Sequence, residues 1–426
     1  MDEDAPPTKK PREILRHPAF AFFWTATTLR AFGSTIAGVA FQVLIVTVIA
    51  ATPAQVGILN ALSVVPYLFL GLVVGAWMDR GRRQRTLVVT TIGRALVLAV
   101  VPILVLTGVL DFWSVAAITL ALGVLTLFGD SAAQPLLPRL VPRSSLPAAN
   151  ARLGQSQTVA QTAGPAIGGA LLAIVGAPIL FVVDAVIAAI AAVLQSRISV
   201  SEAKAPPRAA GRHVGHEIAQ GMRYTYRHPR LRPLAISIHV WFLGNSIVAT
   251  AFVVFALREL ALPAWAYGVA LALGGVGGFV GAVVAPGLGV RLGAGRAILL
   301  GRVLVVLPWA VLALVPLRPD SGIGVILAVV AAAQFVYGLA MGIEDTNDIS
   351  YRQSVAPDRI QGRMNSTIRT VNRSVFFAGA LLAGVLMTSL GLPVTLGIGA
   401  GLFVLAALVI ALSPLRRARH DSSSRS

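Results

Sequence analysis

Five carboxylates stand inside long apolar runs of the sequence, where an ionised side chain costs about 3 kcal/mol or more unless it is paired or reached by water. Asp184 lies near the outer end of one run, where we expect a structural cap. The other four are Asp130 in a second run and Glu344, Asp345 and Asp348 in a third. A carboxylate in a partly dry site can bind and release a proton near neutral pH. These four residues are therefore the candidates for proton coupling.

Basic and amide side chains follow the second group of acids. Asn365, Arg369, Asn372 and Arg373 share one face of an expected helix, from which they can pair with those acids. Such ion pairs either hold the helices together without binding and releasing protons or form part of a proton site, and both interpretations stay open. Asp130 has no arginine close to it in sequence, so it is the better proton carrier.

Other polar side chains inside the runs can line a cavity or form hydrogen bonds between helices. Arg30 can bind an anionic group of a ligand or pair with Asp130. The cavity candidates are Arg30, Gln42, Gln157, Gln161, His239, Asn245, Gln334, Arg369 and Arg373. A cavity of this kind would take a small molecule as its partner.

The composition is typical of a membrane protein. Of the 426 residues, 56% are hydrophobic and 12% are charged, and the mean hydropathy is +0.80. The net charge is +18, but the basic residues lie between apolar runs and not on a soluble module, which argues against nucleic acid as a partner. The chain has no cysteine and no glycine-rich loop followed by lysine, so we expect no enzyme, no metal site and no cofactor.

Apolar runs long enough to span a bilayer must position these side chains. We expect an all-α membrane protein with twelve transmembrane helices, over residues 19–49, 54–77, 86–107, 113–137, 153–176, 178–197, 232–257, 264–289, 297–316, 323–349, 364–390 and 393–413. Lys and Arg concentrate in alternate loops, and only Arg258 and Arg318 fall in loops on the other side. The positive-inside rule therefore predicts that both termini are cytoplasmic.

The chain contains two similar halves. At an offset of 211 residues, 33–41 matches 244–252, and at an offset of 215 Asp130 matches Asp345. Such a repeat is typical of transporters. We expect a six-helix bundle over 1–197, a cytoplasmic connector over 198–231, and a second six-helix bundle with a basic tail over 232–426. A short amphipathic helix in the connector lies on the membrane surface or packs on the bundle.

The loop after the second expected helix carries a cluster of charges, Gly75-Ala-Trp-Met-Asp79-Arg80-Gly81-Arg82-Arg83. Gly75 allows two helices to approach closely, and Asp79 beside several arginines can form charge-assisted bonds to a neighbouring helix end. This motif resembles the glycine-acid-arginine motif of the major facilitator superfamily. The resemblance implies a conformational switch that holds one state and releases another, whereas the alternative is that the arginines only set the topology.

The fifth expected helix carries a second motif, Gly164-Pro165-Ala-Ile-Gly168-Gly169. It is similar to the antiporter motif of this superfamily, in which small residues pack the helix against the other half and the proline bends it. Ordinary tight packing is the alternative. Residues 135–142 resemble the corresponding loop of the bacterial efflux group that includes enterobactin (siderophore) exporters and macrolide efflux proteins.

This resemblance covers nearly the whole chain and implies both a fold and a function. The fold is that of the major facilitator superfamily, with two pseudo-symmetric six-helix bundles, as a monomer in the lipid bilayer of a bacterial inner membrane. The function is export of a small amphipathic molecule, such as a drug, siderophore or biosynthetic product, in exchange for protons. Proton-coupled uptake and a non-transporting membrane sensor are the alternatives. Relatives carry an acid near Ser34 that this chain lacks, so the usual helix-1 proton site is not expected here.

Overall fold

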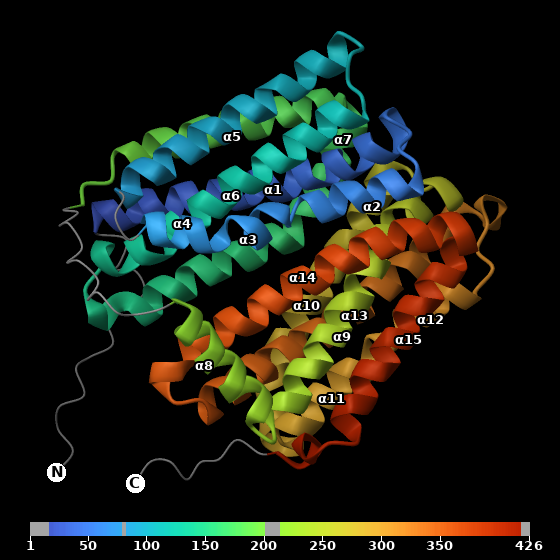
Figure 1. Cartoon of the computed structure of the whole chain (residues 1–426). Helices are drawn as coiled ribbons and strands as arrows, with labels where there is room; N and C mark the ends of the chain where they lie inside the picture. Colours follow the sequence, from blue (N-terminus) through green and yellow to red (C-terminus); the bar gives the residue numbers. More distant parts are fainter. Residues whose placement is uncertain (1–16, 79–81, 201–213, 419–426) are drawn as a thin grey trace, which may run out of the picture. The chain divides into compact units, whose positions relative to one another are not determined.

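A computed structural model describes residues 17–78, 82–200 and 214–418 of the chain (Figure 1). These residues form helices and loops without a β-strand. In this part of the chain, ten helices are long and apolar enough to cross a membrane. The sequence predicts twelve spans, and two features of the backbone account for the difference: one helix contains two spans, and another span is broken into three pieces.

The described residues divide into two compact units. Unit 1 comprises residues 1–41 and 65–206. Its helices are α1 (Pro18–Val43), whose end belongs to unit 2, α3 (Val65–Phe69), α4 (Gly71–Met78), α5 (Arg83–Leu106), α6 (Phe112–Leu140), η3 (Arg143–Ser145) and α7 (Leu146–Ser196). Helix α5 packs against α6 and α7, and α3 and α4 pack against α6. Phe20, Leu87 and Leu136 lie in the buried core of this unit.

Unit 2 comprises residues 42–64 and 207–426. Its helices are η2 (Leu44–Val48), α2 (Pro53–Leu62), α8 (Val214–Arg227), α9 (Leu231–Val254), η4 (Phe255–Glu259), α10 (Ala264–Leu292), α11 (Ala294–Leu304), α12 (Val306–Leu314), η5 (Pro319–Ser321), α13 (Ile323–Val355), α14 (Asp358–Leu390), α15 (Leu392–Ala411) and η6 (Pro414–Arg417). Helix α13 packs against α10 and α11, and α14 packs against α2, α8 and α9. Residues 42–64 thus group with unit 2, and the predicted boundaries at 197 and 232 stay a prediction.

The 51-residue helix α7 contains two spans. The two helical segments meet at Gly176, whose φ of 77° and ψ of 165° are not helical, and Pro178 follows. The corresponding turn between α14 and α15 is made by Gly391, with a φ of 81°. The left-handed region is open to glycine because glycine has no Cβ. The two turns lie at the offset of 215 residues that relates the two halves of the sequence.

The ends of the first and seventh spans are also alike. A π-helical turn, η2, ends α1 and is followed by Ala50 with a φ of 52°. A second π-helical turn, η4, ends α9 and is followed by Ala261 with a φ of 49°. Alanine rarely adopts this conformation, and both copies occur at the offset of 211 residues. The internal repeat is therefore present in the backbone as well as in the sequence.

The second predicted span, 54–77, is divided among α2, α3 and α4. Helix α2 begins with a capping box, in which Gln55 N donates to Thr52 Oγ1 at 3.3 Å and Thr52 N donates to Gln55 Oε1 at 2.8 Å. Helix α2 lies directly against α14, where a Cβ on Gly57 would be 2.6 Å from the Ala380 carbonyl oxygen. This glycine allows the two backbones to touch.

Helix α8 is the amphipathic helix expected in the connector, and it packs against α14 and α9. A Cβ on Gly221 would lie 2.7 Å from Thr367 Oγ1, so α8 sits close on α14. Tyr224 donates to the Val355 carbonyl at 3.3 Å, and Arg363 donates to Gln220. Of the two positions that the sequence left open, the structure shows packing on the helices of unit 2.

Candidate functional site

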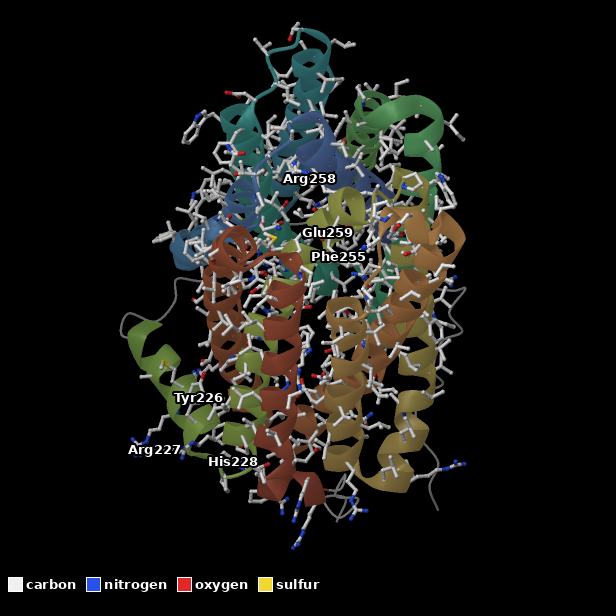
Figure 2. All side chains as sticks on the ribbon, turned by 90° about the vertical axis from the view of Figure 1, so that its right-hand side faces the viewer. Tyr226, Arg227, His228, Phe255, Arg258 and Glu259 are labelled. Carbon is white, nitrogen blue, oxygen red and sulfur yellow. The ribbon has the colours of Figure 1, made fainter. Side chains whose placement is uncertain are left out.

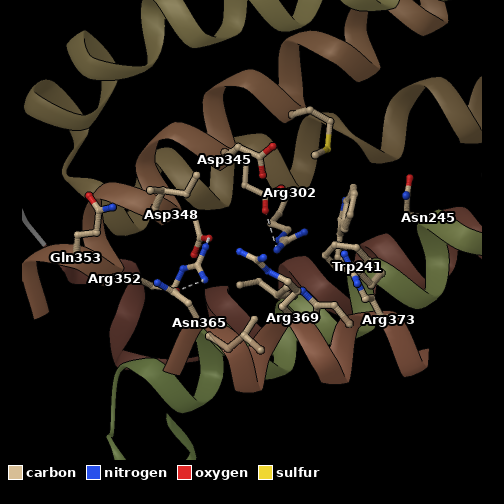
Figure 3. A pocket seen from close by; sticks show the side chains of 17 residues that line it. Trp241, Asn245, Arg302, Asp345, Asp348, Arg352, Gln353, Asn365, Arg369 and Arg373 are labelled. Carbon is tan, nitrogen blue, oxygen red and sulfur yellow. Dashed lines mark hydrogen bonds and ion pairs between the residues drawn. The ribbon is translucent and has the colours of Figure 1, made fainter. Parts of the chain in front are cut away.

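A cavity of about 530 Å³ lies within unit 2, between α9, α11, α13 and α14 (Figure 3). Its walls are partly apolar, with Trp241 and Phe242 on α9, and partly charged. The charged and amide side chains that line it are Asn245, Arg302, Glu344, Asp345, Asp348, Arg352, Gln353, Asn365, Arg369, Asn372 and Arg373. All three predicted proton-coupling acids of the second half therefore face one cavity.

Glu344 and Arg302 form a buried ion pair in the wall of this cavity. Arg302 Nη2 on α11 lies 2.7 Å from Glu344 Oε1 on α13, and their side chains are 1% and 5% exposed. The Arg302 guanidinium also lies over the Trp241 ring, 5.5 Å from its centroid. The second carboxylate oxygen, Glu344 Oε2, is buried without a hydrogen-bond partner. The pair is therefore incompletely satisfied, which makes it sensitive to the loss of either member.

Asp348 and Arg352 form a second ion pair, one helical turn apart on α13. Arg352 Nη2 lies 2.6 Å from Asp348 Oδ2, and Arg352 Nη1 donates to Asn365 Oδ1 on α14 at 3.3 Å. The sequence predicts that Arg369 and Arg373, which lie in α14, can pair with these acids. In the structure, Glu344 pairs with Arg302 and Asp348 pairs with Arg352, and the amide of Asn365 on α14 accepts from Arg352.

Asp345 and Arg369 remain outside these pairs. Both are exposed and line the cavity, and neither makes a hydrogen bond or ion pair within the described residues. In Figure 3, Asp345 enters the pocket from α13 and Arg369 from the side of α14. The cavity thus presents one carboxylate and one guanidinium that are available to a ligand.

A chain of hydrogen bonds joins the connector helix to the cavity. Tyr226 Oη on α8 lies 2.7 Å from His239 Nε2 on α9, and His239 Nδ1 lies 2.7 Å from Asn372 Oδ1 on α14. The Asn372 oxygen can only accept and the Tyr226 hydroxyl can donate, while burial raises the pKa of the Tyr226 phenol. His239 then carries its proton on Nδ1 and donates to Asn372. In Figure 2, Tyr226 and His228 lie at the junction of α8 and α9, at the opposite end of α9 from Arg258.

Unit 1 contains a separate group of charges. Arg94 Nη2 on α5 lies 2.8 Å from Asp184 Oδ2 on α7, and the side chains are 14% and 2% exposed. Gly33 makes room for this carboxylate, because a Cβ at Gly33 would collide with Asp184 Oδ1. Tyr67 donates to Asp130 Oδ2 at 3.1 Å. No ion pair joins Arg30 to Asp130 in the described part of the chain, although the Arg30 guanidinium lies close to Gly129.

The remaining predicted residues lie in varied surroundings. Tyr337 donates to Asn245 Oδ1 at 2.6 Å in the cavity wall. Gln157 and Gln161 are exposed on α7, Gln42 is half-buried at the end of α1, and Gln334 is buried against Gly274 of α10. Within the described residues Gln334 does not line the cavity. A role for the four glutamines as cavity residues stays a prediction.

The two sequence motifs have different outcomes. Asp79, Arg80 and Gly81 lie outside the described residues. Gly75 is in α4, Arg82 is the N-cap of α5, and Arg83 is the first residue of that helix. In the second motif, a Cβ on Gly168 would lie 2.8 Å from the Ile36 carbonyl oxygen, and one on Gly164 would collide with Thr35. These two glycines therefore pack α7 against α1 of the same unit, where the sequence predicted contact with the other half. Pro165 lies inside α7 beside them.

The sequence matches the family described as transmembrane secretion effector over residues 11–426. The chain belongs to this family of the major facilitator superfamily. The multidrug efflux pump Tap of Mycolicibacterium fortuitum is 27% identical over 363 residues, which cover 82% of this chain and 85% of Tap. The uncharacterized MFS-type transporter y4rN of Sinorhizobium fredii (strain NBRC 101917 / NGR234) is 29% identical over 267 residues, covering 61% of this chain and 62% of y4rN.

Solved structures show the same transporter fold. A mutant of the nucleoside transporter NupG superposes with a TM-score of 0.73 at 12% identity, covering 92% of this chain and 99% of NupG. A bacterial homologue of the iron transporter ferroportin gives a TM-score of 0.72 at 18% identity, covering 95% of this chain and 99% of that one. The predicted superfamily fold is confirmed. This transporter is a multi-pass membrane protein, and its relatives are transporters, not enzymes.

Sequence reasoning assigned no role to several residues that the structure places at the two charged sites. Arg94, Arg302, Tyr67 and Trp241 are the principal ones. For the two arginines a signal was present, because an arginine inside an apolar span is a functional candidate by default. For Tyr67 and Trp241 the sequence carries no such signal, since aromatic residues are common in membrane helices.

Proposed function

We propose that this transporter exports a small amphipathic molecule, such as a drug, siderophore or biosynthetic product, in exchange for protons. Alternating access exposes the cavity of unit 2 first to one side of the membrane and then to the other. The protein acts as a monomer in the bacterial inner membrane, with both termini in the cytoplasm. The charged loop from Gly75 to Arg83 acts as a conformational switch.

The position of Asp345 carries the proposal. It is a carboxylate that faces a cavity inside a membrane protein and has no ion pair within the described residues. The charged groups around the cavity are Arg302 from α11, Glu344, Asp348 and Arg352 from α13, and Arg369 and Arg373 from α14. An acid in such a site can exchange a proton with a cavity that opens to water on alternate sides. Glu344 and Asp348 are already paired with arginines, so Asp345 is the first candidate for proton coupling in this half.

Asp130 is the corresponding candidate in unit 1. It is exposed, and within the described residues its partner is the Tyr67 hydroxyl and not an arginine. The similarity to a pump whose name describes multidrug efflux favours export over uptake. It also favours a small organic molecule as the cargo.

Everted membrane vesicles test the proposal. A panel of fluorescent amphiphiles is screened for accumulation when a proton gradient, acidic inside the vesicles, is imposed. The measurement is repeated for each accumulated compound after an uncoupler has collapsed the gradient. We expect gradient-dependent accumulation that Asp345→Asn lowers at least 10-fold. Asp320→Asn, a change in the exposed turn before α13, is the matched control and should leave accumulation unchanged.

Two results would overturn parts of the proposal. If intact cells that contain the protein accumulate the compound against its gradient, the transporter is an uptake symporter. If Asp130→Asn and Asp345→Asn both leave the vesicle accumulation unchanged, these carboxylates do not couple protons to transport.

A further inference from the structure

Among the described residues, one carboxylate and one guanidinium in the cavity of unit 2 are unpaired, and they lie on different helices. Two of its arginines are held by Glu344 and Asp348, at 2.7 Å and 2.6 Å. Asp345 on α13 and Arg369 on α14 are exposed to the cavity and have no hydrogen bond or ion pair within the described residues. A ligand can therefore meet a free carboxylate from one helix and a free guanidinium from another (Figure 3).

The α14 side of the cavity offers hydrogen-bond donors. Arg369 and Asn372 are three residues apart, so they lie on the same face of α14. The Asn372 oxygen already accepts from His239 Nδ1 at 2.7 Å. Its amide NH₂ group is then the part left for a ligand, and an NH₂ group can only donate. Arg369 and Asn372 together suit an anionic group that accepts several hydrogen bonds.

The wall on α9 is apolar. Trp241 is 5% exposed and lines the cavity beside Phe242. A pocket of about 530 Å³ has the size of a site for one small organic molecule. An aromatic or aliphatic body can lie against this wall while polar groups reach α13 and α14.

We propose that this cavity binds a zwitterionic amphiphile, with its amine on Asp345, its anionic group on Arg369 and Asn372, and its apolar body against Trp241. This inference deepens the proposed function and rests on it. An amine and a proton compete for the same Asp345 carboxylate, so a bound amine excludes the proton. That mutual exclusion is what exchange of substrate for protons requires.

Three naphthalene compounds of nearly equal size test the proposal. Naphthylalanine carries both charged groups, 2-(1-naphthyl)ethylamine carries only the amine, and 3-(1-naphthyl)propanoate carries only the carboxylate. Binding to the purified full-length protein is measured by calorimetry without any proton gradient. We expect naphthylalanine to bind at least 10-fold more tightly than either of the others, because a buried polar group left unpaired costs about this much.

Two variants test which residue binds each charged group of the ligand. Asp345→Asn should remove the advantage of naphthylalanine over the propanoate, and Arg369→Gln should remove its advantage over the amine. Asp320→Asn and Arg417→Gln, both exposed and outside the cavity wall, are the matched controls. Equal affinity for naphthylalanine and either single-charge compound would overturn the proposal, and so would an equal loss for all three compounds in each variant.

This binding experiment and the vesicle experiment fail independently. Loss of the zwitterion preference with intact proton-driven export overturns the substrate class alone. A clear preference for naphthylalanine without any gradient-driven export in vesicles overturns the proposed proton exchange and leaves the site in place.

Discussion

Arg302 Nη2 lies 2.7 Å from Glu344 Oε1, and both side chains are almost completely buried. The stability of each buried charge depends on the other charge, because their burial keeps water from solvating either of them. Removing one partner of a buried pair leaves an isolated charge in an apolar region and costs about 3–5 kcal/mol, whereas removing both costs much less.

The first prediction concerns this pair. Glu344→Gln should lower the free energy of unfolding by about 3 kcal/mol, since Arg302 then stays buried and charged without a counter-ion. The double variant Arg302→Gln, Glu344→Gln should recover part of that loss. Thermal unfolding in detergent measures both, with Asp320→Asn as an exposed control. Purely additive losses in the double variant would show that the two residues do not stabilise each other.

A second prediction concerns the contact of α2 with α14. Gly57→Ala places a Cβ about 2.6 Å from the Ala380 carbonyl oxygen and 3.0 Å from Gly384 Cα, which are backbone atoms with no rotamer to change. The two helices must separate, and we expect a loss of about 1–3 kcal/mol.

Gly38→Ala in α1 is the matched control, because nothing lies within 4 Å of a Cβ there. It should leave the thermal unfolding temperature unchanged or raise it slightly, since alanine favours helix over glycine. Equal effects of the two substitutions would mean that the α2–α14 contact is not close in solution.

Much of the architecture follows from the sequence because it depends on local composition. The spans come from apolar length, and the repeat offsets of 211 and 215 residues also relate Ala50 to Ala261 and Gly176 to Gly391 in the backbone. The number of separate helices does not follow. Two spans follow one another directly at Gly176, without a longer loop between them, while the second span breaks into three.

The partner of Glu344 could not be predicted from spacing, whereas Asp348 and Arg352 have the i,i+4 spacing at which helical side chains pair. Arg352 is the nearest arginine to Glu344 in sequence, but the pairing depends on which helices touch. Helix α11 packs against α13 and brings Arg302 to Glu344. Asp184 shows the same limit: the sequence suggested a structural cap at a helix end, and the structure pairs its carboxylate with Arg94.

A third prediction concerns pH. His228 Nδ1 accepts the backbone N–H groups of Arg230 and Leu231 at the start of α9, at 3.3 Å each. Burial, and then the charge of Arg230, lowers the pKa of His228 below its ordinary value. The unfolded chain therefore takes up a proton before the folded protein does as the pH falls.

The stability that this neutral ring supports is present above the unfolded pKa of about 6.5 and is lost as the pH falls through the lower, native pKa. The thermal unfolding temperature should therefore decline more steeply from about pH 7 to pH 5 in the wild type than in His228→Asn. Asparagine can accept a backbone N–H without titrating in this range. Parallel declines would contradict a role for His228.

The last prediction concerns the hydrogen bonds that orient Asn372. Tyr226 donates to His239 Nε2, so the His239 proton sits on Nδ1 and the Asn372 oxygen turns toward it. Tyr226→Phe removes the donor that selects this tautomer. The ring can then carry its proton on Nε2, and Asn372 can turn its NH₂ group toward Nδ1 and its oxygen toward the cavity.

An oxygen in that position repels a bound carboxylate. Tyr226→Phe should therefore weaken the binding of 3-(1-naphthyl)propanoate by about 10-fold, the worth of one hydrogen bond to a charged group. It should leave 2-(1-naphthyl)ethylamine unaffected, because the amine binds at Asp345. Tyr224→Phe, two residues earlier in α8, is the matched control, since Tyr224 donates to the Val355 carbonyl and not to His239.

Nitrogen NMR of histidine-labelled protein separates this positioning role from a merely structural one. The wild type should show His239 with a protonated Nδ1, and Tyr226→Phe should show a mixture of tautomers at an unchanged unfolding temperature. If the tautomer shifts while the affinity for the propanoate stays the same, Asn372 does not contact the anionic group. If the affinity falls equally for the amine and the propanoate, the substitution has altered the packing of α8 and not the orientation of one amide.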